Sequence, residues 1–135
     1  CVDFIFTLND SEMDQLGFSE IDNFYSVGEI GLIQCPGFYK KLDGVIFPSL
    51  LECFSATPLE AMQMSVPLLS SAYPFITSVC KDSALYFDAT DADSIAQLVF
   101  YFSENDVERQ KRLSEGKRLA SLLPSSRDRA DRYVD

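Results

Sequence analysis

The sequence predicts an α/β fold: a Rossmann-like parallel sheet of about five strands with flanking helices. Short runs rich in β-branched and aromatic residues alternate with helical segments along the chain. Strands separated by helices pair in parallel through right-handed crossovers. With 135 residues, of which 47% are hydrophobic, the chain fits one core-forming domain covering residues 1–135.

The predicted strands are short apolar runs bounded by turn residues. They are Asp3–Leu8, Asn23–Gly28, Gly44–Ser49, Val66–Ala72 and Ser83–Ala89. Pro48 stops the third strand because proline cannot donate to a sheet ladder. In such sheets ligands bind beyond the carboxyl ends of the strands, so the loops after these strands are the candidate sites.

The helices are predicted between the strands and after the last one. Their ranges are 9–17, part of 31–43, Pro58–Met64, 74–82, 91–105 and 106–122, with a final helix after Pro124. The first is a polar helix or loop for which Asn9, Asp10 or Ser11 is a possible N-cap. The fifth has apolar residues at the spacing of an amphipathic helix, with Asp91 or Asp93 placed to cap it.

Charge and composition exclude several classes of function. The net charge is −10, and no Lys or Arg precedes Lys40, so a nucleic-acid partner is not expected. The absence of histidine excludes Ser-His-Asp catalysis and His-ligated metal sites. Four cysteines without a CxxC spacing are typical of reduced, mostly buried thiols in a cytoplasmic protein.

The stretch Leu51–Met62, "LECFSATPLEAM", places a glutamate on either side of a small-residue loop. Thr57 and Glu60 fit a capping box with proline at the first helical position, which would leave Glu52 as a surface charge. Alternatively, the loop and the helix N-terminus form a cradle for phosphate or sugar oxygens, and both carboxylates accept hydrogen bonds from hydroxyls. The residues alone leave both hypotheses open.

This stretch also resembles a known family. Seven residues separate Glu52 from Glu60, and the segment from Asp43 to Val99 is similar to the donor-binding half of family-four retaining glycosyltransferases of the GT-B fold, with their E-x7-E motif. The segment "PSLLECFSATPLEAM" is especially similar to bacterial capsular and surface-polysaccharide transferases. The resemblance extends from about Asn23 to the C-terminus.

The resemblance implies a role for each residue of the site. Glu60 would bind the donor ribose, and Glu52 would be catalytic, holding the donor sugar and supporting charge at its anomeric centre. The remaining donor-binding residues would be Phe54, Ser55, Ala56 and Thr57 around the sugar and diphosphate, and Gly28, Glu29 and Ile30 near the base. Cys53 and Ser55 replace glycines usual in the family, which leaves less room for the sugar. The resemblance also implies that the donor is a nucleoside-diphosphate sugar and that no metal and no other cofactor is needed.

The resemblance also implies that this chain is a partial domain. The family's Arg/Lys pair, its first strand and its acceptor-binding N-terminal domain would precede Cys1, and the acceptor would be a saccharide or a lipid-linked saccharide. We therefore expect the chain to be inactive alone. In the strand order 3-2-1-4-5-6, loss of the first strand leaves unpaired edges that favour closure of the sheet or self-association. The parent enzyme would be cytoplasmic, or peripheral at the inner face of the membrane. The alternative is a non-catalytic interaction module with a nucleotide-sugar fold.

Overall fold

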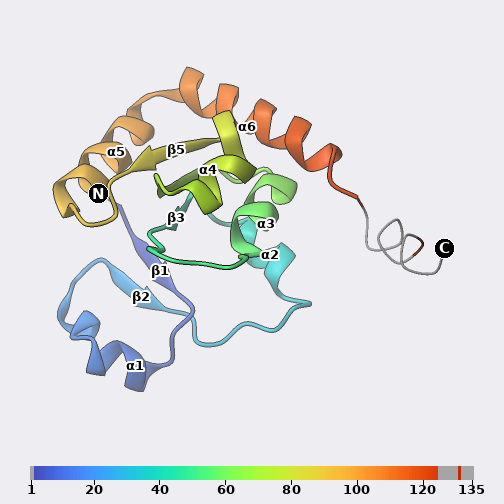
Figure 1. The fold of residues 1–135 in the computed structure, drawn as a ribbon. Coiled ribbons are helices and arrows are strands. Elements are labelled where there is room, and N and C mark those ends of the chain that lie inside the picture. The colour runs from blue at the N-terminus through green and yellow to red at the C-terminus, as the bar shows by residue number, and fades with distance from the viewer. Residues whose placement is uncertain (1, 125–130, 132–135) are drawn as a thin grey trace. The chain divides into compact units, whose positions relative to one another are not determined.

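The computed structural model describes residues 2–124 and Asp131, and it forms two compact units, Cys1–Phe38 and Tyr39–Asp135. Helices and parallel strands alternate along the chain, as the sequence predicted (Figure 1). The helix predicted after Pro124 falls, apart from Asp131, outside the described residues. Each unit is described in turn.

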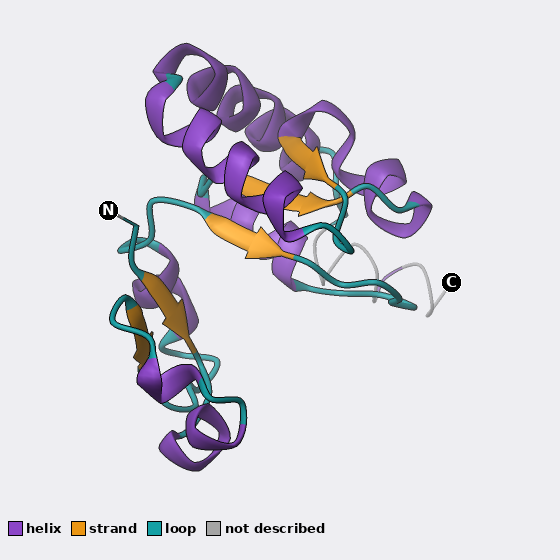
Figure 2. Cartoon of the chain, turned by 90° about the vertical axis from the view of Figure 1, so that its left-hand side faces the viewer, coloured by secondary structure: helices purple, strands orange, loops and turns teal. Residues whose placement is uncertain are grey.

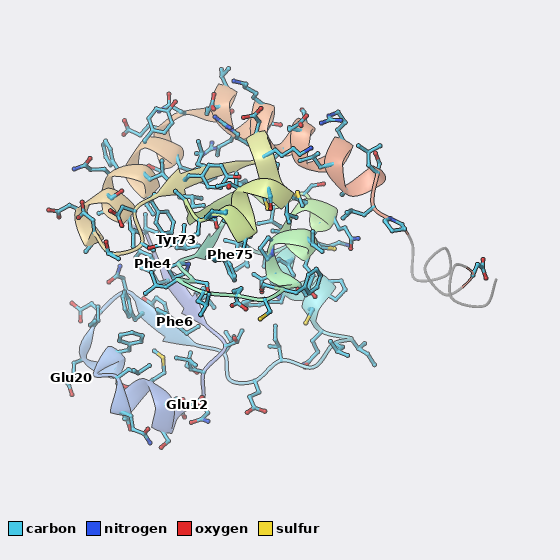
Figure 3. All side chains as sticks on the ribbon, in the orientation of Figure 1. Phe4, Phe6, Glu12, Glu20, Tyr73 and Phe75 are labelled. Carbon is cyan, nitrogen blue, oxygen red and sulfur yellow. The ribbon has the colours of Figure 1, made fainter. Side chains whose placement is uncertain are left out.

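The first unit contains a two-stranded parallel sheet. Its elements are β1 (Phe4–Phe6), α1 (Asp10–Gln15), the 3₁₀ helix η1 (Phe18–Glu20) and β2 (Phe24–Ser26). Phe4 lies opposite Phe24 in the register. The rings of Phe6, Phe18 and Phe24 lie 5.0 to 5.3 Å apart, centroid to centroid. The ring of Phe4 lies 5.2 Å from that of Phe24, with the two planes tilted by 58°. Figure 3 labels Phe4 and Phe6 of this aromatic cluster.

Helix α1 shows how local sequence fixes an element. Of the three predicted caps, Asn9 is the N-cap: its side chain accepts from the Glu12 amide, and the Glu12 carboxylate accepts from the Asn9 amide. This reciprocal pair satisfies two amides that the helix itself leaves without a partner. After the helix Gly17 has a φ of +70°, a conformation that glycine adopts without steric cost.

The second unit contains a three-stranded parallel sheet in the order β3-β4-β5. The strands are β3 (Val45–Phe47), β4 (Leu68–Ser71) and β5 (Ala84–Phe87). The helices are α3 (Thr57–Met64), α4 (Pro74–Cys80), η2 (Lys81–Ser83), α5 (Ala92–Glu104) and α6 (Asp106–Ser121). Helix α2 (Cys35–Tyr39) ends at the first residue of this unit. Figure 2 shows helices packed against the three strands.

The strand pairings agree with the predicted fold class, although the five strands are divided between two sheets. The order 3-2-1-4-5-6 pairs its second strand with its third, its fourth with its fifth, and its fifth with its sixth. The observed pairings of β1 with β2, of β3 with β4 and of β4 with β5 follow that pattern. They are the pairings that remain when the first strand of that order is left out.

The core of the second unit lies between its sheet and α5. Leu69, Leu85, Phe87 and Phe102 form one buried cluster, against which Ile95, Leu98 and Val99 pack. These α5 residues follow the predicted amphipathic spacing. Asp91 caps the helix, because its carboxylate accepts from the Asp93 amide. Among the described residues, no helix is long and apolar enough to cross a membrane.

Helix α6 is rich in charged residues, but one of its faces is buried. Gly116 and Leu119 are buried, and a Cβ at Gly116 would lie 3.5 Å from Met62 Cγ of α3. The guanidinium of Arg112 pairs with Glu108 and donates to the carbonyl of Asp82, 3.0 Å away. One face of α6 therefore covers α3 and η2.

The cysteines differ from the prediction of mostly buried thiols. Cys80 is buried, Cys35 is half-buried and Cys53 is exposed. Cys53 is exposed because it lies in the irregular loop before α3 rather than in a strand or a helix.

Leu69→Ala tests this core. Leu69 is less than 2% exposed, so the truncation removes buried methyl groups and leaves a cavity, and we expect a loss of about 2–5 kcal/mol of unfolding free energy. Urea unfolding followed by circular dichroism measures the loss. Leu50→Ala is the control, since Leu50 is 56% exposed. Equal stability of the two variants would contradict the assigned core.

Burial raises the pKa of the Cys80 thiol to about 11 from its ordinary value of 9.0. The thiol is neutral in both the folded and the unfolded chain below pH 9. Between pH 9 and 11 it ionises only in the unfolded chain, so stability falls as pH rises, by roughly 1.4 kcal/mol per unit of pKa difference. We expect Cys80→Ala to lose less stability than the wild type between pH 8 and pH 10 in urea titrations. If both proteins lost the same stability over this range, Cys80 would not be a source of the pH dependence.

Candidate functional site

The segment that carries Glu52 and Glu60 begins where β3 ends. Ser70 and Ser71, the last residues of β4, are fully buried. The Ser71 hydroxyl donates to the carbonyl of Ser49, 2.7 Å away, and the Ser70 hydroxyl lies 3.4 Å from the carbonyl of Phe47. Because β4 pairs with strands on both sides, these hydroxyls hold the exit of β3 against the centre of the sheet.

Glu52 follows this exit and is half-buried. The hydroxyl of Ser49 lies 3.1 Å from the Oε1 atom of Glu52 and 3.4 Å from the carbonyl of Leu51. A serine hydroxyl carries one proton, and an ionised carboxylate is the stronger acceptor. Ser49 therefore holds one carboxylate oxygen of Glu52.

The loop between Glu52 and α3 is open to solvent on several of its residues. Leu51 is 85% exposed and Phe54 is 70% exposed. Ala56 is also exposed, whereas Ser55 and Thr57 are half-buried. All three of these residues have small side chains, in the segment that leads into the helix.

Glu60 lies in the first turn of α3, but it does not form the capping box that the sequence allowed. The N-cap is Ala56, in helical conformation, and no side chain caps the helix. Thr57 is already the first helical residue, so its hydroxyl is not in the N-cap position. The Oε2 atom of Glu60 instead accepts from the hydroxyl of Tyr39, 2.9 Å away.

Tyr39 is the residue of this site that the sequence did not reveal. It ends α2 and is buried. The sequence predicted only that a short helix lies within residues 31–43. Its phenol reaches a carboxylate 21 positions further along the chain, and no local motif records a pairing over that separation.

The other strands of the sheet also carry distinctive side chains at their carboxyl ends. After β4 the rings of Tyr73 and Phe75 stack, with centroids 6.1 Å apart and planes at 7° (Figure 3). After β5 the hydroxyl and amide of Thr90 donate to Asp88, and these two bonds lower the pKa of the Asp88 carboxyl. Since carboxyl ends of parallel strands share one edge, these loops flank the edge from which Glu52 emerges.

The predicted base-contacting residues belong to the first unit. Gly28 has a φ of +68°, and its amide donates to the hydroxyl of Ser26, 3.1 Å away. That hydroxyl donates to the carbonyl of Leu8, which ties the turn to the end of β1. Glu29 is exposed and Ile30 is half-buried. The structure therefore brings Glu52, Phe54, Ser55, Ala56, Thr57 and Glu60 together on one loop and helix start. Gly28, Glu29 and Ile30 lie apart from them in sequence, in the irregular segment after β2.

The described residues contain no group of three or more Cys, Asp or Glu side chains that could hold a metal ion. What the second unit offers is two half-buried carboxylates on either side of one loop, each accepting a hydrogen bond from one hydroxyl. Ionised carboxylates only accept hydrogen bonds, so their remaining lone pairs suit a ligand rich in hydroxyls.

Comparisons with known proteins bear on the family and the fold of the chain. The family model "Glycosyl transferases group 1" matches residues 19–120. Among solved structures, sucrose-phosphate synthase from Thermosynechococcus elongatus is similar, with a TM-score of 0.75 and 17% sequence identity over 88% of this chain. The chain spans 33% of that structure's length. No curated protein matches the sequence.

The match to the family model runs from within η1 to within α6, and it includes β2, the three-stranded sheet and the loop between Glu52 and Glu60. The likeness to the synthase shows that the fold is that of a GT-B glycosyltransferase, as the sequence predicted. On these findings the chain belongs to the glycosyl transferases group 1 family.

Proposed function

We propose that the chain is the donor-binding part of a family-four retaining glycosyltransferase that uses a nucleoside-diphosphate sugar. The observation that carries the proposal is the placement of Glu52 and Glu60. Both carboxylates are half-buried, lie on either side of one small-residue loop at the carboxyl end of β3, and are oriented by Ser49 and Tyr39. This is the edge of an α/β sheet at which ligands bind.

In this proposal each glutamate binds a different part of the donor. Glu60 accepts hydrogen bonds from the ribose hydroxyls. Glu52 accepts from the sugar hydroxyls and supports positive charge at the anomeric carbon. The backbone from Phe54 to Thr57, with the start of α3, meets the sugar and the diphosphate, since amides at a helix N-terminus favour anions. Gly28, Glu29 and Ile30 contact the base.

Transfer breaks the bond between the anomeric carbon and the diphosphate oxygen, and forms a bond from that carbon to an acceptor hydroxyl, which loses its proton. The transition state resembles an oxocarbenium ion, so a fixed carboxylate near the sugar stabilises it electrostatically. The leaving diphosphate needs cations. We assign that role to an Arg/Lys pair like that of the resembling enzymes, and to none of the residues 1–135.

The remaining elements of the proposal concern the parent enzyme. Its acceptor is a saccharide or lipid-linked saccharide that an N-terminal domain holds. Its product is a capsular or other surface polysaccharide, or a glycoconjugate. The enzyme needs no metal. It acts in the cytoplasm or at the inner face of the membrane. Within that enzyme, residues 1–135 form part of the donor-binding domain, and the edges of their sheets can mediate self-association.

Substitution of Glu60 by glutamine tests the ribose contact. The change keeps the shape but removes the charge, and hydrogen bonds to charged groups are the stronger ones, so we expect UDP or GDP to bind about tenfold more weakly. Calorimetry, or saturation-transfer NMR at low affinity, measures the change. Glu104→Gln, an exposed residue of α5, is the matched control. Binding that is unaffected by Glu60→Gln would favour the non-catalytic interaction module.

The substitution Glu52→Gln tests whether Glu52 contacts the sugar of the donor rather than its nucleotide. Because Glu52 contacts only the sugar in this proposal, UDP and GDP should bind the variant within about twofold of the wild type. The preferred donor among UDP-glucose, UDP-galactose and GDP-mannose should bind several-fold more weakly. Equal losses for the free nucleotide and the donor would place Glu52 outside the sugar site.

The chain by itself should neither transfer nor hydrolyse a donor. Positioning of the acceptor and stabilisation of the leaving diphosphate both depend on groups that we assign to none of the residues 1–135. Chromatographic detection of UDP or GDP released from the same three donors tests this. Turnover by the 135-residue chain would overturn the assignment.

A further inference from the structure

The last residue of helix α2, Tyr39, contacts the candidate site. Tyr39 is 8% exposed, and its hydroxyl lies 2.9 Å from the Oε2 atom of Glu60. A phenol hydroxyl donates one proton, and Glu60 in its ionised form can only accept, so the direction of the bond is fixed.

The backbone beneath Glu60 is rigid, whereas its side chain is long. Pro58, Ala61 and Met62 are buried, which anchors the first two turns of α3. A glutamate side chain nevertheless keeps several rotamers, and restricting it at the moment of binding costs free energy. A hydrogen bond from a buried phenol restricts it beforehand.

The geometry points to Tyr39 as a positioning residue that holds the carboxylate of Glu60 for the two neighbouring hydroxyls of a ribose. A carboxylate has about four lone-pair sites on its two oxygens. Tyr39 occupies one on Oε2, which leaves Oε1 and the second site of Oε2 for the two donors of a vicinal diol. This inference rests on the proposed function and adds to it a residue outside the E-x7-E motif.

The experiment compares the affinities of UDP and of 2′,3′-dideoxy-UDP for the 135-residue chain, with GDP and dideoxy-GDP in parallel. Tyr39→Phe keeps the buried ring and removes only the hydroxyl. We expect it to weaken binding of the ribonucleotide about fivefold and to leave dideoxynucleotide binding unchanged. Tyr101→Phe is the control, since Tyr101 is exposed on α5.

The double variant Tyr39→Phe/Glu60→Gln tests whether Tyr39 acts through Glu60. If it does, the two losses in ribonucleotide affinity are not additive, and the double variant binds about as weakly as Glu60→Gln alone. Additive losses would overturn the inference.

A purely structural role for Tyr39 predicts a different result. Tyr39→Phe would then weaken UDP and dideoxy-UDP equally through a shifted α2 or α3, and that result would also overturn the inference, while the Glu60→Gln measurement could still uphold the proposed function. Wild-type chain that binds UDP and dideoxy-UDP equally would instead refute the ribose role of Glu60, and with it both proposals. Circular dichroism and urea unfolding of each variant show that the chain remains folded.

Discussion

The hydrogen bond from the buried hydroxyl of Ser71 to the carbonyl of Ser49 is the interaction on which the candidate site depends. Ser71 belongs to the strand that is paired on both sides, so its position is fixed by the sheet. Ser49 belongs to the segment that leaves the sheet, and Pro48 before it has no amide to contribute. The bond fixes the backbone at the position from which the side chain of Ser49 reaches Glu52. The orientation of this carboxylate thus follows from the pairing of β3 with β4.

Glu60 is oriented by a different route. Its backbone is fixed by the burial of α3, and its carboxylate by a phenol from α2. The two glutamates therefore depend on separate parts of the second unit, one on the sheet and one on contacts between helices. A substitution that loosens one need not loosen the other, and additivity is expected for sites that share no partners.

Much of the fold was predictable because it is encoded in local patterns. The spacing of Ile95, Leu98 and Val99 identified α5, and Asp91 identified its start. The capping box at Thr57 failed although the local sequence satisfied it. The helix begins at Thr57 itself, so the cap position falls on Ala56, and the carboxylate of Glu60 binds a tyrosine distant in sequence. Local rules describe alternatives of similar free energy, and a tertiary contact decides between them.

The exposed thiol of Cys53 makes the loop beside Glu52 accessible to thiol-directed reagents. At neutral pH Cys80 is buried and protonated, whereas Cys53 stands in the open next to one of the two carboxylates. A thiol-directed fluorophore would therefore label this loop in preference to the core without any engineered substitution. The same exposure makes the loop the part of the described chain on which oxidation would first act.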